Sequence, residues 1–280
     1  MYEEHYGFHQ APFSLTPNTA LFYCVIPHYE AIQMLLSALG MGEGIMKVTG
    51  EVGTGKTLVC RMLINHLPDN FELVYFPNPV MTGHELRQAM AKELGLDTSG
   101  DNIAITDRIH EKLIALQSMG KSVAVFIDEA QALSDEALET IRLFGNLETD
   151  QTKLLQVVLF GQPELDLRLA EYHMRQLRQR ITFSASLREL NCDETTAYIE
   201  ERLKLSGCSF DIFDLAATKA IWKASNGTPR IINQICHKAL LLAYQEKRAT
   251  VNEADLYAAI HDTSDTRKPK FRFPMLWGWS

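Results

Sequence analysis

Eight consecutive residues, Gly50 to Thr57, combine three glycines with a lysine and a threonine. Glycine reaches positive-φ conformations at little steric cost, so such a segment can curl until several backbone N–H groups converge on one anion. The spacing G-x-x-x-x-G-K-[ST] is that of a phosphate-binding loop, in which the lysine contacts the β- and γ-phosphates and the hydroxyl binds Mg²⁺. These roles fall to Lys56 and Thr57. The residues predicted to bind the nucleotide are Gly50, Glu51, Val52, Gly53, Thr54, Gly55, Lys56, Thr57 and Leu58.

The flanking residues favour this interpretation over an ordinary glycine-rich turn. Residues 45–49 are mostly apolar and are typical of a short buried strand that enters the loop. Residues 58–67 are typical of a helix that leaves it. The positive end of that helix dipole would then face the phosphates.

Two neighbouring carboxylates follow an apolar strand at residues 123–127. Because Asp128 and Glu129 come at the carboxyl end of this strand, we expect them at the sheet edge where the phosphate loop lies. There Asp128 can hold the Mg²⁺ shell, and Glu129 can orient and polarise the attacking water. The alternative is a pair of exposed acids at a strand end, which is common, but the phosphate loop favours the catalytic interpretation.

Gln162 and a group of arginines are further candidates. Gln162 closely follows the apolar strand at 154–160, so its side chain is expected between the acidic pair and the γ-phosphate, or as a cap of the next helix. The two interpretations are compatible. Arg175, Arg178 and Arg180 crowd the end of a helix. Their guanidinium groups suit phosphate recognition, although a solvated basic face or cations favoured at a helix C-terminus would also account for them.

Apolar strands alternate with helical patterns up to residue 187, and the helical patterns lie near residues 58–67, 84–94, 103–119, 134–147 and 163–178. The candidate strands are residues 45–49, 71–76, 123–127, 154–160 and 181–185. Their consecutive apolar positions are typical of strands buried on both faces, and the alternation predicts a parallel sheet with helices on both faces. After residue 187 only helical patterns follow, at residues 194–206, 215–224, 230–245 and 253–260.

The sequence therefore predicts an α/β nucleotide-binding domain at residues 1–187, whose N-terminal segment is 1–44. A small all-helical domain follows at 188–262, and a tail at 263–280. The length of 280 residues and the hydrophobic content of 46% suit one large domain with a small one.

Composition excludes several classes of protein. The net charge of −8 argues against a chain built as a whole to coat nucleic acid or anionic lipid. The five cysteines are dispersed without C-x-x-C spacing, which indicates reduced thiols of the cytosol and not a disulfide framework or zinc site. The first residues lack a signal-peptide pattern, and no apolar run approaches the ~20 residues needed to span a bilayer. We expect a soluble, cytoplasmic protein whose membrane association, if any, is peripheral.

Seven short stretches form a wider pattern. They are Tyr6–Phe8, Ala11–Pro17, Thr49–Thr57, Ile127–Gln131, Gly161–Leu165, Leu177–Ile181 and Gly227–Arg230. In these stretches the chain resembles the AAA+ ATPases, and among them the group that contains ExeA (general secretion pathway protein A) and the MSHA-pilus biogenesis protein MshM. The resemblance covers about residues 1–262. It implies a P-loop NTPase fold with a helical lid domain, and ATP with Mg²⁺ as ligands.

The resemblance adds roles that spacing alone does not give. Gln162 falls at the first sensor position, and Arg230 at the second, where the lid reaches back to the γ-phosphate. Arg180, or else Arg178, falls where these ATPases carry the arginine finger that enters a neighbouring subunit's site. That role implies self-association through a head-to-tail interface, commonly as a ring. The predicted catalytic residues are Glu129, Lys56, Gln162, Arg180, Arg178 and Arg230.

The resemblance implies an ATPase that powers or regulates assembly of a cell-envelope machine, an MSHA-type type IV pilus or a type II secretion system. Its partners would be assembly proteins at the inner membrane. Transposition helper ATPases look similar in the same motifs, so a DNA-associated regulator is the alternative. The acidic net charge argues against it.

ExeA-like chains continue into a membrane span and a periplasmic peptidoglycan-binding region, and that mode of anchoring cannot be carried over to this sequence. The basic and aromatic residues at 267–279 would touch an anionic membrane surface, dock on a partner or be disordered.

Overall fold

The computed structural model describes residues 2–16, 21, 23, 25–149, 152–208 and 210–269, which fall into two compact units. The sheet unit comprises Tyr29–Val52 and Val59–Leu187. The helical unit comprises Met1–His28, Gly53–Leu58 and Arg188–Ser280. Two segments that we expected with the sheet, the N-terminal residues and the apex of the phosphate loop, therefore cluster with the helices.

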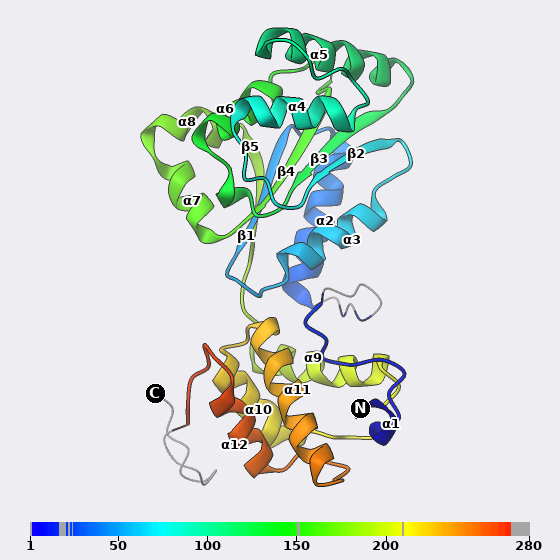
Figure 1. Ribbon diagram of the computed structural model, residues 1–280, viewed down its shortest axis with the longest axis vertical. Coiled ribbons are helices and arrows are strands. Elements are labelled where there is room, and N and C mark those ends of the chain that lie inside the picture. Colours follow the sequence, from blue (N-terminus) through cyan, green and yellow to red (C-terminus); the bar gives the residue numbers. More distant parts are fainter. Residues whose placement is uncertain are drawn as a thin grey trace. The chain divides into compact units, whose positions relative to one another are not determined.

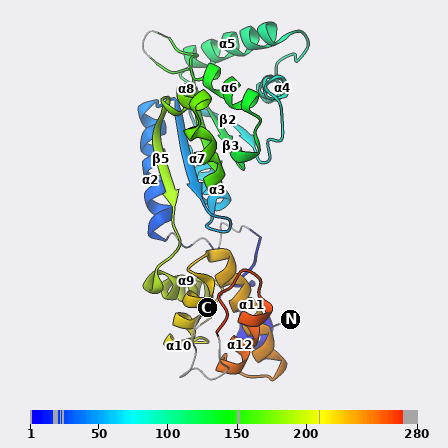
Figure 2. The same cartoon turned by 90° about the vertical axis from the view of Figure 1, so that its left-hand side faces the viewer.

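In the described part of the sheet unit, five parallel strands form one sheet in the order β2-β3-β4-β1-β5 (Figure 1). The strands are β1 (Ile45–Gly50), β2 (Phe71–Phe76), β3 (Ser122–Ile127), β4 (Leu155–Gly161) and β5 (Ile181–Leu187). All five predicted strands are confirmed. Every residue of β4 is buried, as its continuous apolar run predicts, whereas burial alternates along β5 because this strand lies at the edge of the sheet (Figure 2).

Each connection between successive strands contains at least one helix, as parallel strands require. The helical segments are α2 (Ile26–Met41), α3 (Lys56–His66), α4 (Gly83–Glu93), α5 (Asn102–Ser118), η2 (Ala130–Ala132), α6 (Asp135–Phe144), α7 (Pro163–Ala170), η3 (Tyr172–Met174) and α8 (Arg175–Arg178). Side chains of the strands and of α4, α5 and α6 form one apolar core, in which Val125 and Leu159 are almost completely buried. This burial holds the strand ends, and the residues that follow them, in fixed positions.

The predicted continuous helix at 163–178 is wrong in one respect, because the chain breaks after α7. Glu171 takes an extended conformation there, with ψ at 149°. The Arg178 guanidinium donates to the carbonyl of Ala170 at 3.0 Å, which satisfies a backbone acceptor at the C-terminus of α7. A side chain from the following turn thus stabilises the early helix end.

The helical unit is built on α1 (Glu3–Tyr6), α9 (Cys192–Leu205), α10 (Leu215–Ser225), α11 (Pro229–Gln245) and α12 (Glu253–Asp262). Its core also contains four aromatic side chains of the N-terminal segment, Tyr2, Tyr6, Phe8 and Phe13. Because these rings bury a large apolar area, they account for the clustering of the N-terminal segment with the helices. No helix among the described residues is both long and apolar enough to cross a membrane.

The chain after α12 is described as far as Pro269. The Lys268 ammonium donates to the carbonyls of Ile260 and Thr263, which satisfies acceptors at the end of α12. Most of the predicted basic-aromatic tail, residues 270–280, lies outside the described residues.

The turn between α10 and α11 depends on Gly227. Its φ is +75°, and a Cβ built on it would lie 2.0 Å from the carbonyl oxygen of Leu190. The same two residues are also joined by a bond from the Leu190 N–H to the Gly227 carbonyl, at 2.9 Å. A side chain at this position would therefore clash with the Leu190 backbone, and it would also force a strained positive φ on a residue other than glycine.

We expect Gly227→Ala to lower the free energy of unfolding by about 3–4 kcal/mol, since left-handed strain and a steric clash add together. Gly7→Ala is the matched control in the same unit, because Gly7 also has positive φ but a Cβ on it would have no other atom within 4 Å. It should cost about 1–2 kcal/mol. Urea unfolding followed by circular dichroism measures both. Equal losses in the two variants would contradict the clash.

Candidate functional site

Three adjacent strands place the predicted polar residues of the sheet unit at one edge. The register pairs Thr49 of β1 with Gly161 of β4, and Ile127 of β3 with Leu159 of β4. The residues that follow these strands, among them Asp128 and Gln162, thus come from neighbouring strand ends. In parallel sheets the carboxyl edge is where ligands bind.

The phosphate loop connects β1 to α3 and has the conformation of an anion cradle. Gly53 and Gly55 have φ values of +87° and +102°, which favour glycine. Thr54 and Lys56 are 1% and 5% exposed, and Lys56 is the first residue of α3. Curled backbone at the N-terminus of a long helix supplies the N–H groups and dipole that a polyphosphate needs. The residues present therefore fit a bound nucleotide.

Both glycines are also closely covered within the helical unit. A Cβ on Gly53 would lie 2.7 Å from Cβ of Arg230, and one on Gly55 would lie 2.8 Å from Nε2 of His28. The Arg230 N–H, at the start of α11, donates to the Gly53 carbonyl at 3.2 Å. The structure thus places the backbone of the predicted second-sensor residue directly on the phosphate loop.

The acidic pair directly follows β3. Asp128 is 2% exposed, and its Oδ1 accepts a hydrogen bond from the Glu129 N–H at 3.0 Å. Glu129 has φ of +53°, a left-handed conformation that is uncommon for a residue with a side chain. Strained backbone of this kind concentrates at functional sites. The short helix η2 begins immediately afterwards.

Two glutamine side chains hold the carboxylate of Glu129. Its Oε2 accepts from Nε2 of Gln131 at 2.6 Å and from Nε2 of Gln162 at 3.1 Å. Oε1 of Gln131 in turn accepts from the backbone N–H of Gln162 at 3.0 Å. Gln162 makes no side-chain capping bond to α7, so its amide is directed at the acid. Sequence reasoning gave Gln131 no role, although it ends the Ile127–Gln131 stretch.

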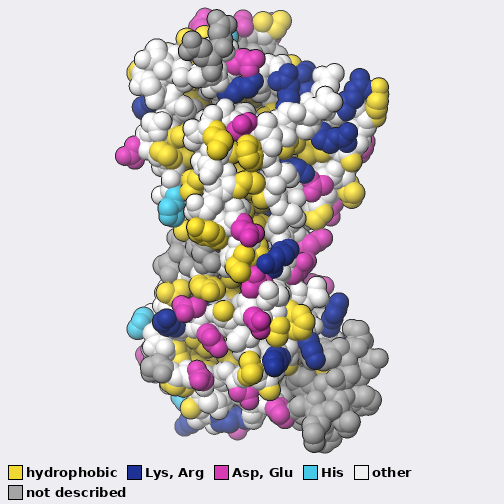
Figure 3. Space-filling view, turned by 180° about the vertical axis from the view of Figure 1, so that it is seen from behind, with side chains coloured by type: hydrophobic (Ala, Val, Ile, Leu, Met, Phe, Trp, Pro, Cys, Tyr) yellow, Lys and Arg dark blue, Asp and Glu magenta, His cyan; other side chains and the backbone are white. Residues whose placement is uncertain are grey.

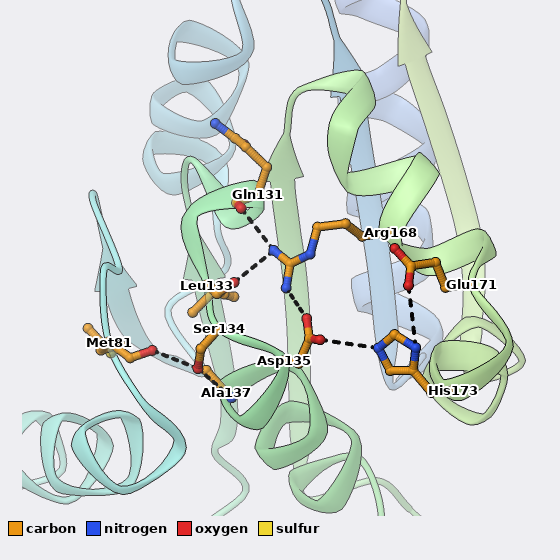
Figure 4. Close-up of polar contacts among 9 residues, drawn as sticks. All are labelled: Met81, Gln131, Leu133, Ser134, Asp135, Ala137, Arg168, Glu171 and His173. Atoms are coloured by element: carbon orange, nitrogen blue, oxygen red, sulfur yellow. Dashed lines mark hydrogen bonds and ion pairs between the residues drawn. The ribbon is translucent and has the colours of Figure 1, made fainter.

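Arg168 of α7 ties the turn after Glu129 in place (Figure 4). Its guanidinium donates to the carbonyls of Gln131 at 2.9 Å and Leu133 at 2.7 Å, and it forms an ion pair with Asp135. The hydrogen bonds from Arg168 and His173 hold the pKa of the Asp135 carboxyl below its usual value. The helix that carries Gln162 is therefore fastened to the turn that carries Gln131.

The predicted arginine-finger candidates both contact backbone of their own unit. Arg178 is exposed, and its guanidinium makes the bond to the Ala170 carbonyl described above. The Arg180 guanidinium is half-buried and donates to the carbonyl of Gly145 at 3.4 Å. The third arginine, Arg175, stacks over the ring of Tyr172 at 4.1 Å from the centroid.

Comparison with known proteins agrees with this geometry. Residues 39–169 match the family model described as AAA domain. General secretion pathway protein A of Aeromonas hydrophila is 40% identical over 269 residues, which are 95% of this chain. The match covers 49% of that protein, so the chain spans about half the length of this curated relative.

Solved structures show the same fold at low identity. Cdc6p of Pyrobaculum aerophilum has a TM-score of 0.68 at 17% identity, over 89% of this chain and 69% of that one. ORC2 of Aeropyrum pernix has a TM-score of 0.65 at 15% identity, over 90% and 73%. RuvB T158V of Thermotoga maritima has a TM-score of 0.59 at 17% identity, over 89% and 73%. The sheet, the phosphate loop and the curated relative agree, and the chain belongs to the AAA+ ATPases of the ExeA type.

Proposed function

We propose that this chain binds ATP with Mg²⁺ and hydrolyses it. The observation that supports this most directly is the convergence of three adjacent strand ends. The phosphate loop follows β1, the acidic pair follows β3, and Gln162 follows β4. Hydrolysis of a phosphoanhydride requires a held polyphosphate and an oriented water, and this edge carries candidates for both tasks.

The phosphate loop would hold the β- and γ-phosphates through its backbone N–H groups and through Lys56. Thr57 and Asp128 are the residues that would hold Mg²⁺, because a hydroxyl and a carboxylate are oxygen ligands of the kind this ion takes. The ion, when bound, would neutralise negative charge on the phosphate oxygens.

Glu129 would accept a hydrogen bond from the attacking water and take its proton. Since Oε2 of Glu129 already accepts from two amides, Gln131 and Gln162 set the orientation of the carboxylate. Gln162 would also sense the γ-phosphate through the same amide group. Gln131 would act as a positioning residue, because it bridges the acid and the backbone of Gln162.

The remaining arginines would act on charge that develops in the transition state. Arg230 would reach the γ-phosphate from α11, whose first turn already contacts the phosphate loop. Arg180, or else Arg178, would enter the site of a neighbouring subunit. Such a role implies a nucleotide-dependent oligomer, with a ring as the simplest closed arrangement.

The partner is proposed from the curated relative. The name of that protein refers to the general secretion pathway, and we propose that the present chain powers or regulates assembly of a type II secretion system or an MSHA-type pilus at the cytoplasmic side of the inner membrane.

A DNA-associated role is the alternative. Acidic side chains are scattered among the basic ones over the face drawn in Figure 3, and the overall charge of −8 does not favour a duplex-coating surface.

The first test separates nucleotide binding from hydrolysis. We expect Lys56→Ala to abolish ATP binding, because it removes the point charge on the phosphates. Glu129→Gln should bind ATP normally but lower turnover by about 10²–10⁴-fold, the range for loss of a general base. Filter binding with labelled ATP and phosphate release measure the two steps. Normal turnover by Glu129→Gln, or tight binding by Lys56→Ala, would refute the assignment.

The second test concerns the arginine finger. Arg180→Ala alone should lower turnover by about 10³-fold or more. Mixing it with Lys56→Ala should restore part of the activity, because an intact site meets an intact arginine wherever the Lys56→Ala subunit supplies its Arg180 to the site of the Arg180→Ala subunit. Arg178→Ala, mixed in the same way, is the matched control that decides between the two arginines. If neither mixture gains activity, the arginines do not act between subunits.

The third test concerns Gln131. Gln131→Met keeps the length of the side chain but loses both amide hydrogen bonds, and it should lower kcat by about 10–100-fold, since a hydrogen bond to a charged group contributes roughly 1.5–3 kcal/mol. The dissociation constant of ATP should stay unchanged. The double variant with Gln162→Met should lose less transition-state stabilisation, measured from kcat, than the two single variants lose together, because both side chains donate to the same oxygen of Glu129. The exposed Gln176→Met serves as control, and additive losses would show that the glutamines act independently.

A further inference from the structure

A histidine from the N-terminal segment touches the phosphate loop inside the helical unit. His28 is 4% exposed, and its Nε2 lies 2.7 Å from the carbonyl oxygen of Thr54. A carbonyl oxygen can only accept, so Nε2 carries the proton and donates. The ring also packs against Gly55, where a Cβ would lie 2.8 Å from Nε2 and 2.9 Å from Cε1.

The hydrogen bond fixes the direction of one peptide group of the loop. In a trans peptide the C=O and the following N–H point in opposite directions. A donor that holds the Thr54 carbonyl on one side therefore directs the Gly55 N–H to the other side. The same reasoning applies one residue earlier, where the Arg230 N–H holds the Gly53 carbonyl and so directs the Thr54 N–H.

Two consecutive peptide groups of the loop are thus oriented by donors from outside it. Their N–H groups point away from His28 and from the start of α11, and a glycine-rich loop uses such N–H groups to bind phosphate. Gly55 needs this support because glycine has the largest range of accessible backbone conformations. Without the imidazole, the peptide between Thr54 and Gly55 would lose this hydrogen bond.

Burial keeps the imidazole neutral. Desolvation lowers the pKa of His28, although the bond to the Thr54 carbonyl opposes that shift. A neutral ring with its proton on Nε2 contributes geometry to the loop and no charge of its own. The positive charge offered to the phosphates by the loop then stays with Lys56.

The segment that carries His28 is itself anchored. Arg202 of α9 is 4% exposed and donates from Nε to the Pro12 carbonyl at 2.7 Å and from an Nη to the Leu21 carbonyl at 3.1 Å. Two buried charge-assisted bonds hold the chain on both sides of residues 13–20. His28 follows seven residues after Leu21, in the first turn of α2, where its N–H donates to the Val25 carbonyl at 3.0 Å.

We propose that His28 is a positioning residue of the phosphate loop, which orients the Gly55 N–H for binding the β-phosphate of a nucleotide. The inference rests on the proposed nucleotide binding and adds to it a residue outside the P-loop motif. It predicts that His28 matters for every nucleotide with a β-phosphate, and that it matters through the proton on Nε2.

The experiment compares two substitutions with the unmodified chain. His28→Leu keeps the volume and loses the donor, and we expect it to weaken binding of both ADP and ATP by about tenfold, the effect of one hydrogen bond of about 1.4 kcal/mol. His28→Gln can place an amide N–H where Nε2 lies, and it should stay within about threefold of the unmodified chain. Turnover at saturating ATP should change much less than the KM in both variants.

His66→Leu is the matched control, because the ring of His66 also bonds a backbone carbonyl, that of Met62, but at the far end of α3. It should leave nucleotide binding unchanged. Unchanged binding by His28→Leu would overturn the proposal, as would equal losses in the Leu and Gln variants. If His28→Leu does not fold, His28→Asn replaces it, since its amide is too short to reach Thr54. Failure of the unmodified chain to bind any nucleotide would refute the proposed function instead.

Discussion

A polyphosphate must be met by backbone N–H groups that all point the same way, and this requirement governs the arrangement of the phosphate loop. Glycines at positions 53 and 55 allow the necessary positive φ values, but they also make the loop prone to rotate. The structure counters this by holding the loop carbonyls from outside, with the His28 ring on Thr54 and the Arg230 N–H on Gly53. The glycines let the loop adopt its curled conformation, and the two hydrogen bonds then hold it there. Because the loop is already ordered, it loses less conformational entropy when a ligand binds.

The acidic end of the site follows the same principle with different groups. Buried residues of β3 and β4 fix the backbone position of Glu129, which has a left-handed conformation. Its long side chain would still allow the carboxylate several positions. Gln131 and Gln162 restrict it by donating to the same oxygen, and Arg168 fastens the backbone of Gln131 to α7. A general base must lie within hydrogen-bond reach of its water, about 2.6–3.2 Å, and must be held to about 0.5 Å of the productive position, which is why supporting side chains of this kind matter.

The strands and the phosphate loop could be predicted from the sequence, because their signals lie in residues that are close together along the chain. The five strands appear as apolar runs, and the fixed spacing of the loop identifies Lys56 and Thr57, because both signals depend on residues close together in the chain. His28 and Thr54 are 26 residues apart, and Gln131 and Gln162 are 31 apart. No periodicity links such pairs, so the supporting contacts stayed hidden. The clustering of the N-terminal segment with the helices was missed for the same reason, since it depends on the burial of Tyr2 and Phe13 against helices beyond residue 190.

The chemistry of the supporting groups is consistent across the chain. The donors that orient the loop and the acid are an imidazole that burial keeps neutral, two primary amides and a backbone N–H. A charged group at the buried position of His28 would carry a desolvation penalty of several kcal/mol and would change the electrostatic potential at the phosphates. The charge of Arg168 is neutralised by its ion pair with Asp135, and its guanidinium acts on carbonyl oxygens beyond the acid. The charged groups proposed to act on the ligand are then Lys56, Asp128 and Glu129, which would face the phosphates, the metal ion and the water, together with the arginines proposed above.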